Sequence, residues 1–117
     1  MTNKKLKEYI INCCENHIAI PKPESGHVFI EKIGTTKIVE TEKEGFQYSE
    51  NRKYVPFETL FLCYKELLVS GELKTEWFKK TFPNEYKGRP CNFTTIGGVF
   101  ELLNIATYKS RGVYIKK

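Results

Sequence analysis

The chain has 117 residues, 40% hydrophobic and 14% aromatic, so it can form one domain with a packed core and is too apolar for global disorder. Nineteen Lys and Arg residues outnumber fourteen Glu residues, giving a net charge of +5, and the chain contains no Asp. The lack of Asp removes the usual Ser-His-Asp triads, EF-hand loops and Asp-based magnesium sites, so we expect a binding module and not an enzyme.

The start of the chain and its cysteines bear on location and cofactors. The apolar stretch behind the basic start covers only residues 9–11, too short for a signal peptide or a membrane span, so a cytoplasmic protein without membrane contact is expected. Four cysteines are too few for a disulfide framework and are expected to be reduced. Cys14, His17 and His27 come nearest to a metal pattern, but no C-x-x-C accompanies them, so neither a metal nor another cofactor is expected.

The first half of the chain predicts one helix followed by strands. Residues 3–16 place Leu6, Ile10 and Cys13 on one helical face. Residues 27–33 and 36–41 have strand composition, and Gly34-Thr35 between them predicts the turn of a hairpin. Residues 42–45 predict a further turn, and residues 46–48 a third short strand.

The second half predicts three helices and a terminal hairpin. A helix starts at Pro56 and is capped by Gly71, and a short helix covers residues 74–81, followed by a polar connection at 84–90. A third helix, capped by Asn92 or Thr94, extends to residue 103. Its Gly97-Gly98 pair costs about 1 kcal/mol per Gly relative to Ala, so we expect another element to pack closely there. Residues 105–108 and 113–115 predict a hairpin with a basic tip at 109–112.

These elements predict an α+β fold in a single compact domain, residues 1–117. Residues 1–53 form a helix plus a small antiparallel hairpin or sheet, packed on a three-helix sub-region at 54–117. Three helices followed by a hairpin resemble the winged-helix superfamily, with residues 92–103 as its third helix and 109–112 as its wing. The resemblance implies DNA binding, with the third helix in the major groove and the wing on the backbone or minor groove.

Charge is unevenly distributed. Residues 73–117 hold nine Lys or Arg and three Glu, a net charge of +6, while the rest of the chain carries −1, an asymmetry that favours binding to a polyanion. The predicted third helix has no Lys, Arg or Gln, so mainly backbone contacts are expected, with short polar side chains at its start. The candidate DNA-binding residues are Lys79, Lys80, Lys87, Arg89, Asn92, Thr94, Thr95, Lys109 and Arg111.

Two main hypotheses follow. The first is a small cytoplasmic protein that binds double-stranded DNA, as a transcriptional or mobile-element regulator. The alternative is a protein interaction or inhibitory module that binds no nucleic acid; a nuclease accessory domain is a third, weaker option. The DNA hypothesis requires the late cations to form one positive surface and residues 92–95 to be exposed, whereas their burial beneath the first half favours protein docking. The oligomeric state stays open.

Overall fold

The computed structural model describes residues 1–117, apart from the side chain of Ser25. Its elements in chain order are α1 (Asn3–Glu15), β1 (Ala19–Lys22), the 3-10 helix η1 (Pro23–Ser25), β2 (Gly26–Ile38), β3 (Thr41–Tyr48), β4 (Lys53–Pro56), α2 (Phe57–Ser70), β5 (Glu72–Lys74), α3 (Thr75–Thr81), α4 (Pro83–Gly88), α5 (Cys91–Leu102), β6 (Ala106–Ser110) and β7 (Val113–Lys116). The fold is α+β, as the sequence predicts.

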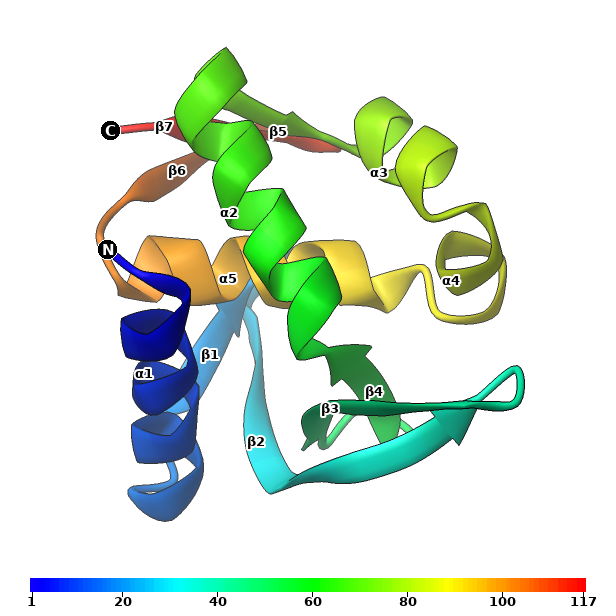
Figure 1. Cartoon of the computed structure of the whole chain (residues 1–117). Helices are drawn as coiled ribbons and strands as arrows, with labels where there is room; N and C mark the ends of the chain where they lie inside the picture. Colours follow the sequence, from blue (N-terminus) through cyan, green and yellow to red (C-terminus); the bar gives the residue numbers. More distant parts are fainter.

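Two antiparallel sheets lie on either side of α5 (Figure 1). The first sheet has the strand order β1-β2-β3-β4 and curls into a half-barrel. The second has the order β5-β7-β6 and includes the terminal hairpin. In Figure 1, α5 runs through the middle of the molecule, with the first sheet below it and the second above it. The helix is therefore an interior element.

The helices with a clear apolar period form as predicted. In α1, the side chains of Leu6, Ile10 and Cys13 are buried, and the Thr2 hydroxyl caps the first turn by accepting from the Lys5 amide at 3.1 Å. In α2, the chain leaves the helix at Gly71 with φ of 78°, a left-handed conformation that glycine adopts without strain. Local periodicity and end signals are sufficient to place both helices.

The predicted hairpin between residues 27–33 and 36–41 is wrong. Strand β2 continues through Gly34, and the turn lies at Val39 and Glu40, which have φ of 45° and 67°. Such a two-residue turn normally selects Asn or Gly, so the sequence gives no local signal for it. Gly34 instead pairs with Gly45 of β3, which the sequence assigned to a turn.

Several short elements were not predicted. Strand β1 contains Pro21, which an edge strand tolerates because the missing amide need not donate inside the sheet. Strands β4 and β5 are too short for a periodic signal and depend on their partners. The expected polar connection at 84–90 contains helix α4, with Pro83 in its first turn.

One cluster of buried side chains connects the two halves of the chain. Leu6 and Ile10 of α1, Phe46 of β3, Leu60 of α2 and Phe100 of α5 all belong to it and are fully buried or nearly so. Burial of this kind is the main favourable contribution to folding, at about 25 cal/mol per Å² of apolar surface. Residues of both segments, 1–53 and 54–117, therefore contribute to this one cluster.

Candidate functional site

Helix α5 is packed between β1 and β7, and this packing limits which of its residues could contact a ligand. A Cβ atom at Gly98 would lie 2.1 Å from the Pro21 carbonyl oxygen of β1, and one at Gly97 would lie 2.1 Å from the Tyr114 ring of β7. The close packing expected at this glycine pair is therefore confirmed. Because β1 lies against α5, the helix has no free face for a DNA groove along this contact.

Asn92 is fully buried and hydrogen-bonded to three partners. Its Oδ1 accepts from the Tyr48 hydroxyl at 2.6 Å, and its Nδ2 donates to the Tyr54 carbonyl at 2.9 Å and to Glu85 Oε2 at 2.7 Å. The side chain thus links α5 to β3, β4 and α4. It does not cap the helix, whose N-cap residue is Pro90.

The two threonines that follow also face the first half of the chain. Thr95 is fully buried and Thr94 is half-buried. The Lys22 ammonium of β1 donates to their hydroxyls, at 2.7 Å for Thr94 and 3.3 Å for Thr95. Residues 92–95 therefore lie beneath the amino-terminal half, where the sequence analysis placed a DNA-facing surface.

The predicted cations lie on several elements. Lys79 and Lys80 are in the last turn of α3, Lys87 is in α4, and all three are exposed. The hairpin tip, with exposed Lys109 and Arg111, lies next to α3, because the Thr75 amide donates to the Gly112 carbonyl at 2.9 Å.

Arg89 alone of the predicted set lines a hollow together with cations from the first half of the chain. We call this space the basic hollow, and its volume is about 430 Å³. Its lining residues are Thr36, Gln47, Asn51, Arg52, Lys53, Tyr54, Gly88 and Arg89. Three of these lining residues, Arg52, Lys53 and Arg89, are cations, and none of the lining residues is acidic. The hollow thus combines fixed positive charge with amide and hydroxyl groups.

The register of the first sheet builds one wall of the basic hollow. Lys32, Gln47 and Tyr54 are cross-strand neighbours, so their side chains lie on one face. Gln47 and Tyr54 line the basic hollow, and together with Lys32 they line a smaller adjoining hollow of about 40 Å³. The Tyr54 hydroxyl donates to the Gly34 carbonyl oxygen at 2.8 Å. To reach it, the Tyr54 side chain crosses β3 at Gly45, where a Cβ atom added to the glycine would come within 2.9 Å of the Tyr54 ring. Glycine at 45 therefore permits the position of Tyr54.

The β3–β4 turn supplies two further lining residues. Asn51 and Arg52 have φ of 56° and 54°, the two-residue turn geometry that Asn favours. Both are exposed, and the next residue, Lys53, begins β4. Arg52 and Lys53 are not predicted from the sequence as binding residues, because they stand in the half of the chain with a net negative charge. The adjacent Arg52 and Lys53, directly after a turn signal, were the available clue.

The cations of the basic hollow form no direct ion pair, although Lys53 helps to lower the pKa of the nearby Glu50 carboxyl. No ion pair of Arg52, Lys53 or Arg89 forms among the residues that the structure describes. Lys53 instead donates to the Cys91 thiol at 3.3 Å. The Nε atom of Arg89 is buried and has no hydrogen-bond partner. A buried donor without a partner costs folding free energy, so this position of Arg89 does not stabilise the fold through Nε.

The two acids nearest these cations in the sequence are engaged elsewhere. Glu85, four residues before Arg89, accepts from Thr59 at 2.8 Å and from Asn92. Glu50 pairs with Lys22 at 3.3 Å. Burial raises the pKa of the Glu50 carboxyl, but Lys22, the Cys91 thiol and Lys53 outweigh it, so the net shift is downward. Glu50 is therefore ionised at neutral pH and tied mainly to Lys22.

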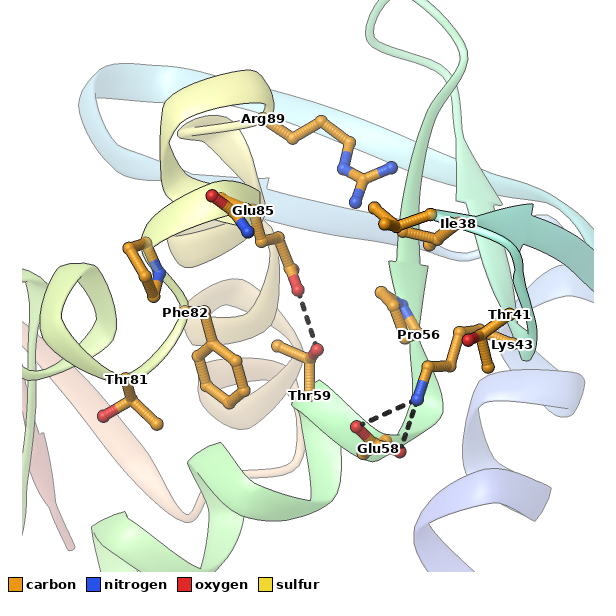
Figure 2. A pocket seen from close by; sticks show the side chains of 13 residues that line it. Ile38, Thr41, Lys43, Pro56, Glu58, Thr59, Thr81, Phe82, Glu85 and Arg89 are labelled. Carbon is orange, nitrogen blue, oxygen red and sulfur yellow. Dashed lines mark hydrogen bonds and ion pairs between the residues drawn. The ribbon is translucent and has the colours of Figure 1, made fainter.

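A second hollow, which we call the hairpin groove, borders the basic hollow at Arg89 (Figure 2). It has a volume of about 460 Å³ and lies between the β2–β3 hairpin and helices α2 to α4. Its acids contact nearby groups: Glu58 pairs with Lys43 at 3.1 Å, and Glu85 accepts from Thr59. Figure 2 shows the Arg89 guanidinium pointing away from α4 toward Ile38.

Neither a metal-binding cluster nor a membrane-spanning helix occurs in the part of the chain that the structure describes. No group of three or more Cys, His or Glu side chains able to hold a metal ion occurs among the described residues. Across the same residues, no helix is long and apolar enough to cross a membrane. Comparison with family models, curated proteins and solved structures finds no match.

Proposed function

We propose that this protein binds nucleic acid, with duplex DNA as the first ligand to test, by holding the phosphate backbone. The observation that carries the proposal is the basic hollow, in which Arg52, Lys53 and Arg89 meet without an acid among the lining residues. Displacement of condensed counterions by such cations drives nucleic-acid binding. The winged-helix mode of binding needs residues 92–95 exposed on α5, and it is not proposed because Asn92 and Thr95 are fully buried. Nucleic-acid binding is proposed instead through the basic hollow, which does not need those residues.

The cations of the wing-like hairpin are proposed as additional contacts. Lys109 and Arg111 are exposed at its tip, beside α3 with Lys79 and Lys80. Four helices, α2 to α5, precede the β6–β7 hairpin, where the winged-helix resemblance predicts three, and β5 pairs with the β7 edge of that hairpin. These cations are assigned to peripheral backbone contacts, which position a duplex without reading its sequence.

The test is a salt-dependent titration of a duplex of about 20 base pairs, labelled at a 3′ end. With about four phosphate contacts, affinity should fall about 100-fold between roughly 50 and 200 mM salt. The double variant Arg52→Gln, Arg89→Gln should weaken binding and lower the salt slope by about two. A matched control, Lys4→Gln, Lys65→Gln, removes two exposed charges from α1 and α2 and should change the slope little.

Absence of binding at low salt contradicts the proposal. The burial of residues 92–95 would then favour the alternative, docking on a protein, and the charge of the hollow calls for an acidic partner. Polyglutamate is the probe for that alternative, because it offers carboxylates without phosphate. Polyglutamate binding that is lost in the Arg52→Gln, Arg89→Gln variant, together with no DNA binding, would assign the hollow to an acidic protein.

A further inference from the structure

The basic hollow is lined from three parts of the fold. One wall is the sheet face with Thr36 and Gln47, a second is the β3–β4 turn with Arg52, and a third is the α4–α5 junction with Arg89. A group that projects from the end of a strand can enter such a space.

The charge of the hollow distinguishes an internal phosphate from a terminal one. An internal phosphodiester carries one negative charge, whereas a phosphomonoester carries about −1.5 to −2 at neutral pH. Arg52, Lys53 and Arg89 supply three positive charges with no acid among the lining residues. This excess matches a monoester more closely than a diester, and the Arg89 fork suits bidentate bonding to phosphate oxygens.

We propose that the basic hollow binds the terminal phosphomonoester of a nucleic-acid strand. Arg89 donates to the phosphate from the α4–α5 junction, Arg52 and Lys53 bind it from the β3–β4 side, and the Gln47 and Asn51 amides lie beside it as further donors. This inference rests on the proposed nucleic-acid binding. Free phosphate and mononucleotides share the same chemistry, and the test separates them.

The experiment compares one oligonucleotide with a 5′-phosphate and with a 5′-hydroxyl, labelled at the 3′ end, in single-stranded and duplex form. Charge-assisted hydrogen bonds to the additional phosphate should make the phosphorylated form bind at least about tenfold more tightly. Arg89→Met should remove most of this preference and Arg89→Lys should restore part of it, because lysine keeps the charge but not the fork.

Stability measurements on Arg89→Met and two further variants distinguish a loss of folding from a loss of phosphate binding. Since Arg89 Nε has no partner in the folded chain, Arg89→Met should leave the urea midpoint unchanged or raise it. Arg52→Gln changes an exposed turn residue and should reduce the phosphate preference without unfolding the protein. Lys109→Gln, at the hairpin tip, should weaken both oligonucleotides equally.

The outcomes are distinct. Equal binding of the two oligonucleotides overturns this inference and leaves the proposed function standing, whereas no binding of either contradicts both. Adenosine monophosphate or inorganic phosphate binding as tightly as the phosphorylated strand would assign the hollow to a free phosphate ester and overturn the strand-end assignment. A 3′-phosphate that increases affinity as much as a 5′-phosphate does, measured with the label moved to the 5′ end, would support binding of a terminal phosphomonoester at either end.

Discussion

Asn92 has the side chain expected of a base-contacting residue, yet its hydrogen-bonding capacity is used inside the protein. It accepts from Tyr48 and donates to the Tyr54 carbonyl and to Glu85, so one side chain satisfies groups from three other elements. An isolated Asn at a helix start has the same sequence signature in either role. Only the burial of its surroundings decides between them.

Replacing Asn92 by Ala should destabilise the protein by about 3 kcal/mol, because the Tyr48 hydroxyl, the Tyr54 carbonyl and the Glu85 carboxylate lose a buried partner. Urea unfolding followed by circular dichroism measures the change. Asn84→Ala, on the exposed surface of α4, is the control and should stay within about 0.5 kcal/mol of the parent. A loss below about 1 kcal/mol for Asn92→Ala would show that this network contributes little.

At the scale of elements, glycine has different roles that sequence patterns do not distinguish. Gly71 ends α2 with a positive φ, as its position after an apolar helix predicts. Gly34 and Gly45 predict turns equally well, but they lie in paired strands where Tyr54 crosses the sheet. Gly98 sits inside α5 because β1 approaches it closely. The helical cost of Gly97-Gly98 was the one local sign of this approach.

Gly98→Ala should destabilise the fold by about 2 to 3 kcal/mol, since the added Cβ would meet the Pro21 carbonyl at 2.1 Å and backbone would have to move. The unfolding midpoint in urea reports this loss. Gly88→Ala is matched in chemistry but has open space around its Cβ, so it should be neutral or stabilising by up to about 1 kcal/mol. Similar effects of the two changes would argue against the close contact between β1 and α5.

At the scale of the whole molecule, the two sheets enclose one helix and bury tyrosines on both sides of it. Tyr48 of the first sheet and Tyr114 of the second are fully buried. Burial raises the pKa of both phenols above the ordinary value of 10, and burial also raises that of Tyr9 to about 12. The folded state therefore holds these protons more tightly than the unfolded chain does.

Stability should be insensitive to these tyrosines below about pH 9 and should fall above pH 10, by about 1.4 kcal/mol per pH unit for each buried phenol. The sign follows because unfolded phenols ionise near pH 10 while the buried ones stay protonated. Tyr114→Phe keeps the ring against Gly97 and removes one titrating group, so it should reduce the slope. Urea unfolding between about pH 8 and 11.5 tests this. An unchanged slope would mean that Tyr114 does not contribute.

The sequence by itself determined the elements whose signals are local: α1 and α2 from their apolar period, the stop at Gly71, and the terminal hairpin around Gly112. Tertiary structure alone decided the rest. Short strands such as β4 form only against a partner, and the turn at Val39 and Glu40 follows from pairing that local propensity opposes. Arg52 and Arg89 share one hollow because the first sheet and the α4–α5 junction meet in space, and contacts between residues so far apart in the chain leave no periodic trace in the sequence.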